Sequence, residues 1–198
     1  MEASAPVVVK VGGSLFDLPN LGAHLKRWLD RLGSPVLIVP GGGRAVDAVR
    51  DLDRTHKLGE ETCHWLALEA MSQSALFLSK LLDNAPVIKK APGQQTDKPN
   101  GRLAILDAHL FAREDEGLPG CLPHCWDVTS DSIAARAAAV FGASSLVLLK
   151  SAAIPNDASL AQAQQMGIVD PYFRKALIPA INLQLLNFGQ WAHENPAL

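Results

Sequence analysis

Val7-Val8-Val9-Lys10-Val11-Gly12-Gly13-Ser14 is the stretch that decides the fold. Its β-branched run, residues 7–11, predicts a buried strand that ends at a pair of glycines. Two glycines allow a tight turn whose backbone N–H groups face outward, and such a group of donors can cradle an anion. A lysine in a buried strand costs free energy unless it is paired. Lys10 therefore indicates a phosphate as the anion, although a glycine pair can also serve only as the turn that ends a strand.

The same order of strand, glycine loop and helix recurs in the next part of the chain. Residues 34–40 form a second short apolar run, Gly41-Gly42-Gly43 follows it, and residues 45–52 have the spacing of a helix. Strands that alternate with helices predict a parallel sheet covered on both faces, whose ligands bind beyond the carboxyl ends of the strands. Because three successive glycines are costly in chain entropy, we interpret them as a close approach of a ligand to the backbone.

The remaining elements are predicted from the periodicity of apolar residues. Helices are expected around residues 25–32 and at 60–82 and 133–141, strands at 87–90, 103–106 and 145–151, a loop at 94–102, irregular or partly helical structure at 152–164, and a strand or helix at 178–188. No domain boundary stands out in the composition. The chain is therefore interpreted as one domain, residues 1–198.

Polar side chains gather at the start of the alanine-rich helix predicted at 133–141. Thr129, Ser130 and Asp131 are each candidates for its N-cap, where a side-chain oxygen accepts from an exposed N–H group. The strand that follows this helix carries Lys150 near its end. Two strands thus each deliver a lysine near a loop, and the charge of a polyphosphate requires cations arranged in this way.

Composition excludes several classes of function. The chain has 198 residues, of which 48% are apolar, and its net charge of -2 gives no reason to expect nucleic acid as a partner. No apolar run approaches the length that spans a bilayer, and the N-terminus leads into a strand without a signal peptide. Three cysteines do not indicate a disulfide framework. The prediction is a soluble protein in a reducing, cytoplasmic setting.

The stretch that contains Cys121, His124 and Cys125 raises the question of a zinc site. Its spacing is not that of a standard zinc motif, and a second close pair of ligands is missing. Distant residues would have to complete the site: Cys63, His64 or His109. Buried free thiols are the favoured interpretation.

Taken together, the motifs resemble those of the amino acid kinase family, which includes acetylglutamate, aspartate, uridylate and isopentenyl phosphate kinases. The resemblance rests on four stretches in the family's order: Lys10-Val-Gly-Gly-Ser14, Pro40-Gly-Gly-Gly43, Thr129-Ser-Asp-Ser132 and Leu148-Leu-Lys150-Ser151. Within the family, residues 126–135 are most similar to the small kinases of methanofuran biosynthesis, which phosphorylate an aminomethylfuran methyl phosphate to the diphosphate. The chain is short after Lys150, and residues 152–155 stand where many relatives carry an Asp-Gly pair.

The resemblance implies a three-layer α/β/α sandwich around a mostly parallel sheet. Roughly residues 1–125 would bind a small-molecule phosphoryl acceptor, and roughly residues 126–198 would bind ATP. The implied activity is that of an ATP-dependent phosphotransferase, with Mg²⁺ held by the phosphates and no metal ligand from the protein. A homo-oligomer without nucleic-acid or membrane partners is also implied. The implied acceptor is a phosphomonoester similar to aminomethylfuran methyl phosphate. A carboxylate acceptor, or a nucleotide-binding protein without catalysis, is the alternative.

The resemblance also implies a role for each site residue. The catalytic residues would be Lys10, Asp131 and Lys150, with Asp131 orienting Lys10 through a charge-assisted hydrogen bond. The nucleotide would be bound by Gly12, Gly13, Ser14, Ser130 and Lys150. The acceptor would be bound by Gly41, Gly42, Gly43 and Arg44. Further cations that would favour a phosphate acceptor lie nearby in the sequence: Lys57 and His64.

Overall fold

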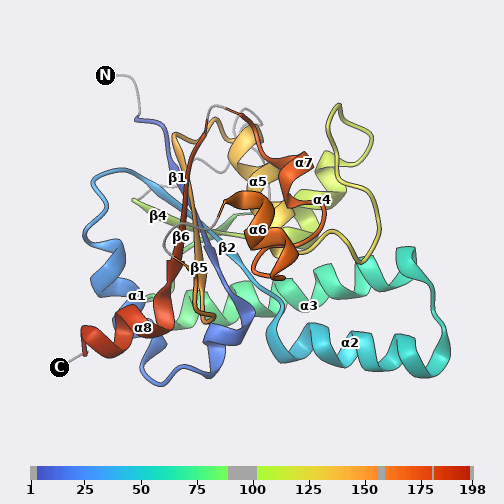
Figure 1. Ribbon diagram of the computed structural model, residues 1–198, viewed down its shortest axis with the longest axis horizontal. Helices are drawn as coiled ribbons and strands as arrows, with labels where there is room; N and C mark the ends of the chain where they lie inside the picture. The colour runs from blue at the N-terminus through green and yellow to red at the C-terminus, as the bar shows by residue number, and fades with distance from the viewer. Residues whose placement is uncertain (1–3, 89–101, 156–158, 180, 197–198) are drawn as a thin grey trace.

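One parallel sheet forms the centre of the molecule (Figure 1). The computed structural model describes residues 4–88, 102–155, 159–179 and 181–196. Within these residues the sheet has six strands, in the order β3-β4-β2-β1-β5-β6, and every pairing is parallel. The strands are β1 (Val7–Val11), β2 (Val36–Pro40), β3 (Val87–Ile88), β4 (Leu103–Leu106), β5 (Ser145–Lys150) and β6 (Asn182–Asn187). The predicted α/β fold around a parallel sheet is confirmed.

Helices connect the strands and cover the sheet. They are the 3-10 helix η1 (Gly13–Asp17) and the α-helices α1 (Leu21–Leu29), α2 (Gly43–His56), α3 (Glu60–Leu81), α4 (Ala108–Asp115), α5 (Ser130–Val140), α6 (Leu160–Gln165), α7 (Phe173–Ala176) and α8 (Phe188–Glu194). Most predicted elements are present with bounds shifted by a few residues. The ambiguous segment 178–188 contains β6 and leads directly into α8.

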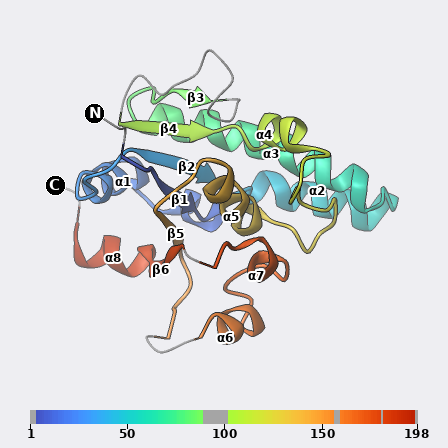
Figure 2. The ribbon, with the colours of Figure 1, turned by 90° about the horizontal axis from the view of Figure 1, so that it is seen from above.

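Two hydrophobic cores, one on each face of the sheet, make the structure three-layered. Side chains alternate between the faces of a strand, so Val8 packs in one core while Val7 and Val9 pack in the other. Helices α4, α5, α6 and α7 cover the face of Val8, and α1 and α8 cover the opposite face (Figures 1 and 2). The long helix α3 contributes Leu68 to the first core and Leu78 to the second.

Strand β1 lies at the point of the sheet from which the chain first adds strands on one side and later on the other. It pairs with β2 on one side and with β5 on the other. Strands β3 and β4 lie beyond β2, whereas β6 lies beyond β5. In open α/β sheets, ligands bind at such a switch point, beyond the carboxyl ends of the strands. The segments that follow β1, β2 and β5 therefore border the expected site, and two of them are the glycine loops.

The two glycine loops pack against each other, backbone to backbone. A Cβ atom at Gly13 would lie 2.2 Å from the amide nitrogen of Gly43, and one at Gly41 would lie 2.3 Å from the amide nitrogen of Gly13. Gly43 also has a φ of +55°, a conformation that favours glycine. We predicted that the glycines allow a ligand to approach the backbone closely. In the structure each glycine loop closely approaches the other, and this contact joins the ends of β1 and β2.

Parts of two predictions fall on residues that the structure does not describe. The strand expected at 87–90 is described only at Val87–Ile88. The loop expected at 94–102 lies outside the described residues except for Arg102. In the described parts of the chain, no helix combines the length and the apolar character needed to cross a membrane.

The packing of the glycine loops leads to a prediction about stability. We expect Gly13→Ala to lower the free energy of unfolding by about 1–3 kcal/mol, because the new methyl group meets backbone atoms that cannot rotate away. Gly33→Ala is the matched control, since a Cβ there has nothing within 4 Å. Urea unfolding of the two variants measures the difference. Equal stabilities would show that the loops are not packed as described.

Candidate active site

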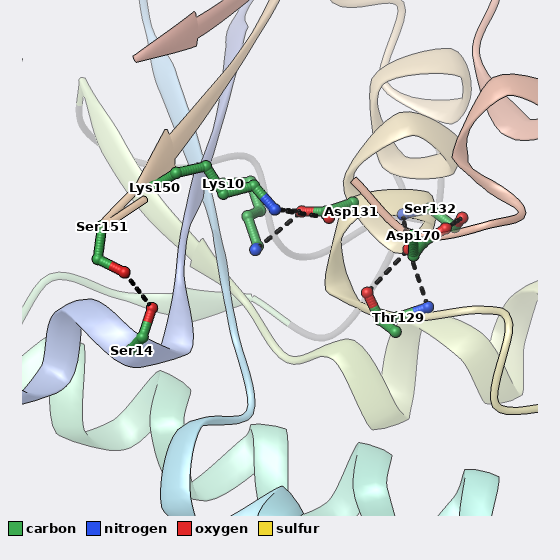
Figure 3. A network of polar contacts seen from close by, with 8 residues as sticks. All are labelled: Lys10, Ser14, Thr129, Asp131, Ser132, Lys150, Ser151 and Asp170. Atoms are coloured by element: carbon green, nitrogen blue, oxygen red, sulfur yellow. Dashed lines mark hydrogen bonds and ion pairs between the residues drawn. The ribbon is translucent and has the colours of Figure 1, made fainter. Parts of the chain in front are cut away.

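Lys10 lies in the central strand, and its side chain is buried. Only 4% of the residue is exposed. It shares the strand face of Val8, which packs in the core beneath α5. There its ammonium group meets Asp131, the second residue of α5, at an N–O distance of 2.8 Å (Figure 3). The free energy cost of burying this lysine is thereby offset by an ion pair.

Lys150, the last residue of the adjacent strand β5, reaches the same carboxylate. Its Nζ atom lies 2.6 Å from Oδ2 and 2.8 Å from Oδ1 of Asp131 (Figure 3). Asp131 is only 3% exposed, so it bridges two ammonium groups inside the protein. We refer to Lys10, Asp131 and Lys150 as the charged triad. The structure thus brings the three residues that were predicted to be catalytic into direct contact.

Burial and neighbouring charges act in opposite directions within the charged triad. Burial alone would raise the pKa of Asp131, but the charges of Lys10 and Lys150 outweigh it and lower this pKa. Burial is the main reason that the pKa of Lys150 falls to about 8; the charge of Lys10 adds to this effect, and Asp131 opposes it. With one carboxylate between two ammonium groups, the charged triad carries net positive charge at neutral pH and suits an anionic ligand.

The start of α5 is capped by a residue that the sequence analysis missed. Thr129 is the N-cap, but its side chain makes no capping hydrogen bond. The carboxylate of Asp170 accepts from the backbone N–H and the hydroxyl groups of both Thr129 and Ser132 instead (Figure 3). The prediction of a local cap by Thr129, Ser130 or Asp131 is therefore wrong. The side chain of Asp131 serves the lysines and not the helix.

Two of the glycine amides predicted to bind phosphate are already engaged in the sheet. The N–H of Gly12 donates to a carbonyl at the end of β5, and the N–H of Gly41 donates to the last carbonyl of β1. The assignment of these two amides is therefore corrected. Three other amides of the loops have no hydrogen-bond partner in the described residues: those of Gly13, Gly42 and Gly43. They lie at the starts of η1 and α2, where free N–H groups attract anions.

A hydrogen bond between two serines joins the loop after β1 to the segment after β5. The hydroxyl groups of Ser14 and Ser151 lie 2.7 Å apart (Figure 3). Both residues directly follow a motif that carries a lysine of the charged triad. Ser151 was not among the predicted site residues, although its position after Lys150 was a signal for it. The pair places two further polar groups beside the free amide of Gly13.

A cavity of about 270 Å³ lies beside the glycine loops, between α2, α3 and the start of α5. The residues that line it with backbone groups or hydroxyl groups are Gly13, Ser14, Gly42, Gly43, Thr129 and Ser130. Its apolar lining consists of Val46, Ala67, Leu68, Met71, Val128 and Ile133. The larger polar and aromatic side chains are Asp47, Arg50, His64, Cys125 and Trp126. The cavity thus unites residues predicted for the nucleotide with residues predicted for the acceptor, and Ser130 connects it to Asp131.

Arg44, which was predicted to bind the acceptor, does not line this cavity. Its side chain is 85% exposed and forms an ion pair with Asp17 at 2.9 Å. Arg50 lines the cavity instead, paired with Asp47 at 2.8 Å. The assignment of Arg44 is therefore corrected. Helical spacing was the available signal, because positions 43, 46, 47 and 50 share one face of a helix.

Trp126 gives the cavity an aromatic wall that is held from α2. Its indole N–H donates to Asp53 at 3.2 Å, and the guanidinium group of Arg50 lies 5.2 Å from its ring centroid. The hydrogen bond from Trp126 is the main reason that the pKa of Asp53 is lowered. The indole is therefore fixed by a hydrogen bond at its edge and a cation over its face. Sequence analysis placed Trp126 in a family-like motif but gave it no role.

The two further cations expected near the acceptor do not supply charge to the cavity. His64 lines it, but burial, together with the charge of His124, lowers the pKa of His64 to about 4. Its imidazole is therefore neutral at neutral pH. Lys57 caps the far end of α2 and is not part of the lining. Arg50 is the arginine that borders the cavity.

The structure does not support the alternative of a zinc site. In the parts of the chain that are described, no group of three His, Cys, Asp or Glu side chains could hold a metal ion. His124 stacks on the ring of His64, with 4.9 Å between the centroids. The three cysteines are free thiols, but only Cys63 is buried, whereas Cys121 is exposed and Cys125 is half-buried. The expectation of buried thiols therefore holds for one of the three.

The structure is thus a parallel α/β fold with a buried, positively charged triad and two glycine loops at the switch point of its sheet, where such folds bind ligands. The comparison with known proteins places it more narrowly. The chain belongs to the amino acid kinase family, whose pattern matches residues 5–153. The residues that carry this match include the central strand, both glycine loops and the whole charged triad.

The chain is also similar to individual members of this family. It is 34% identical over 133 residues to [5-(aminomethyl)furan-3-yl]methyl phosphate kinase of Methanocaldococcus jannaschii. That match covers 64% of this chain and 56% of the relative, so it spans little more than half of the relative's length.

Solved structures of UMP kinases share the fold. The UMP kinase of Ureaplasma parvum has a TM-score of 0.64 at 14% identity, with 98% of this chain and 96% of that chain covered. The UMP kinase of Bacillus anthracis has a TM-score of 0.61 at 16% identity, with 94% and 88% covered. The uridylate kinase of Archaeoglobus fulgidus has a TM-score of 0.58 at 15% identity, with 92% and 90% covered. At such identities the likeness shows the fold alone.

The low pKa of Lys150 predicts a pH dependence. A lysine whose pKa lies near 8 loses its positive charge as the pH rises through that value. We expect kcat/KM for the nucleotide, which reports on the free enzyme, to fall above about pH 8 for this reason. A series of initial rates from about pH 6 to about pH 10 measures it. Lys150→Arg keeps its charge and should move the decline to higher pH; an identical profile for this variant would contradict the assignment.

Proposed function

We propose that this protein transfers the γ-phosphoryl group of ATP to a small phosphomonoester and so forms a diphosphate. The charged triad is the observation that carries the proposal. Two buried ammonium groups are fixed by one carboxylate near the ends of adjacent strands. The glycine loop with the free amide of Gly13 follows one of these strands, and Ser130, the neighbour of Asp131 in sequence, lines the cavity. Phosphoryl transfer requires that the protein position the reacting groups and place fixed positive charge around the phosphoryl group. The charged triad can do both.

In this proposal each lysine acts on a different part of the reaction. Lys150, together with the hydroxyls of Ser14 and Ser151, contacts the phosphates of the nucleotide. Lys10 and the amide of Gly13 stabilise the oxygens of the group in transfer. An oxygen of the acceptor phosphate forms a bond to the γ-phosphorus, the bond to the bridging oxygen breaks, and ADP leaves. A phosphomonoester is largely ionised at neutral pH, so its oxygen needs no strong general base.

Asp131 acts as a positioning group for the two lysines. Both of its oxygens are engaged by ammonium groups, so it is available neither as a base nor as a metal ligand. Mg²⁺ would therefore arrive with the nucleotide and would need no ligand from the charged triad, which agrees with its preference for few protein ligands. When bound, Mg²⁺ neutralises charge on the β- and γ-phosphates.

The cavity is the proposed site of the acceptor. The amides of Gly42 and Gly43 would receive its phosphate, and the apolar lining with Trp126 would receive its body. A volume of about 270 Å³ lies just below the usual range of about 300–1,000 Å³ for ligand pockets, which favours a small acceptor. The relative named above acts, by its name, on a phosphomonoester with a flat ring and an amine. An acceptor of this class is proposed here, with Asp47 offering a carboxylate to the amine.

The two alternatives, a carboxylate acceptor and a nucleotide-binding protein without catalysis, differ from this proposal in the cavity that they require. A carboxylate acceptor such as an amino acid is polar at both ends and has no apolar body to pack against the side of the cavity formed by Leu68, Met71 and Ile133. A protein that only binds nucleotide has no need of a cavity with an apolar wall and Trp126 beside the glycine loops. The role in a methanofuran-type pathway and the homo-oligomer stay predictions that rest on the resemblance. The cytoplasmic setting stays a prediction that rests on composition.

An acceptor panel tests the proposal. ADP release from Mg-ATP is followed with [5-(aminomethyl)furan-3-yl]methyl phosphate, with simple aromatic phosphomonoesters, and with acetylglutamate and aspartate. We expect the highest kcat/KM for the aminomethylfuran compound. Lys10→Ala, the matched negative control, should lower the rate about 10²–10³-fold, the usual cost of losing one preorganised charge. Preference for a carboxylate acceptor, or ADP release that no acceptor stimulates, would overturn the proposal.

A further inference from the structure

Asp170 is a buried carboxylate that makes all of its hydrogen bonds to the first turn of another helix. It is 6% exposed and lies between α6 and α7. Its Oδ2 atom accepts from the N–H of Thr129 at 3.0 Å, from the hydroxyl of Thr129 at 2.8 Å and from the N–H of Ser132 at 3.0 Å. Its Oδ1 atom accepts from the hydroxyl of Ser132 at 2.5 Å. The four bonds join segments that are 38 to 41 residues apart in the sequence.

These bonds surround the central residue of the charged triad. Asp131 lies between Thr129 and Ser132 in the sequence, so the groups that Asp170 holds are on both sides of it. The first turn of a helix lacks partners for its N–H groups, and here no side chain of the turn supplies the capping bond. The position of this turn therefore depends on a carboxylate from the C-terminal part of the chain. Figure 3 shows the carboxylates of Asp131 and Asp170 on opposite sides of the turn.

We propose that Asp170 is a positioning residue for phosphoryl transfer, which fixes the first turn of α5 so that Asp131 holds Lys10 and Lys150 in their reactive places. The inference rests on the proposed function for its effect on the rate. Asp170 touches no reacting atom in this account and acts through Asp131. The carboxylate of Asp170 also occupies the N-terminus of α5, where a negative charge interacts favourably with the helix dipole. Substrate phosphates are therefore expected at the free amides of α2 and η1 and not at α5.

The expected consequence is a loss of rate that exceeds any loss of binding. Phosphoryl transfer depends on alignment, and a displacement of about 1 Å can lower a rate by about 10²-fold. An asparagine at position 170 keeps one acceptor oxygen but replaces the other with a donor, which cannot serve the donors of Thr129 and Ser132. The first turn of α5 then shifts, and Asp131 shifts with it. The free amides at α2 and η1 stay in place, so we expect kcat to change more than either KM value, although Thr129 and Ser130 of the shifted turn also line the cavity.

Asp170→Asn is the test, and Asp107→Asn is its matched control. Asp107 is a buried helix cap of the same kind: it accepts from the N–H of Leu110 at 3.1 Å and from the hydroxyl of Ser72 at 2.7 Å, but it caps α4, outside the cavity lining. We expect a smaller drop in melting temperature for Asp107→Asn, because both of its bonds are made to one oxygen, which an asparagine keeps. We expect kcat to fall about 10²-fold for Asp170→Asn alone. In an Asp131→Asn background, Asp170→Asn should lower kcat no further, as for residues that act as one unit.

A second measurement does not depend on the reaction. NMR titration of ¹³C-labelled lysine follows the pKa of Lys150. Burial and the charge of Lys10 lower this pKa to about 8, and contact with Asp131 keeps it from falling further. We expect this pKa to fall in Asp170→Asn and to stay unchanged in Asp107→Asn. A wild-type chain without kinase activity would refute the proposed function and leave this readout intact. An unchanged Lys150 pKa and kcat in Asp170→Asn, or an equal loss of kcat in Asp107→Asn, would overturn the positioning role.

Discussion

One carboxylate that holds two buried ammonium groups is the constraint on which the rest of this structure depends. Lys10 and Lys150 come from neighbouring strands and would repel each other without Asp131 between them. Removing one partner of a buried ion pair typically costs about 3–5 kcal/mol, so the charged triad stabilises the fold only as a complete set. The surplus of positive charge that remains is available to an anionic ligand. Stability and the proposed chemistry thus rest on the same three side chains.

Several features of the fold follow from the need to bring this carboxylate to the switch point of the sheet. Helix α5 must begin there, and its alanines allow it to lie close to β1, with no exposure at Ala134 or Ala138. The glycine loops pack backbone to backbone, which holds the free amides at the ends of β1 and β2. The cap of α5 must come from elsewhere, because Asp131 is engaged by the lysines. Asp170 supplies it, and the C-terminal part of the chain thereby becomes part of the site.

The sequence predicts features that local pattern decides and misses those that depend on distant contacts. The strands, the glycine loops and the three residues of the charged triad each lie in a short motif, which is why they could be predicted. The contact between Lys150 and Asp131 was not predicted. Which loop amides are free depends on the register of the sheet, so Gly12 and Gly41 were assigned wrongly. Arg44 was predicted because it adjoins the glycines in sequence, and Arg50 was not considered, whereas helical geometry places Arg50 at the cavity. Nothing local marks Asp170, which meets Ser132 across 38 residues.

The most direct test of the charged triad is a crystal structure of the protein with Mg²⁺ and a non-hydrolysable ATP analogue. The measured quantity is the distance from each lysine Nζ atom to the phosphate oxygens. The account predicts that Lys10 and Lys150 both lie within about 3 Å of β- or γ-phosphate oxygens, with Asp131 still bridging them. A nucleotide bound elsewhere, with both ammonium groups in contact only with Asp131, would contradict it.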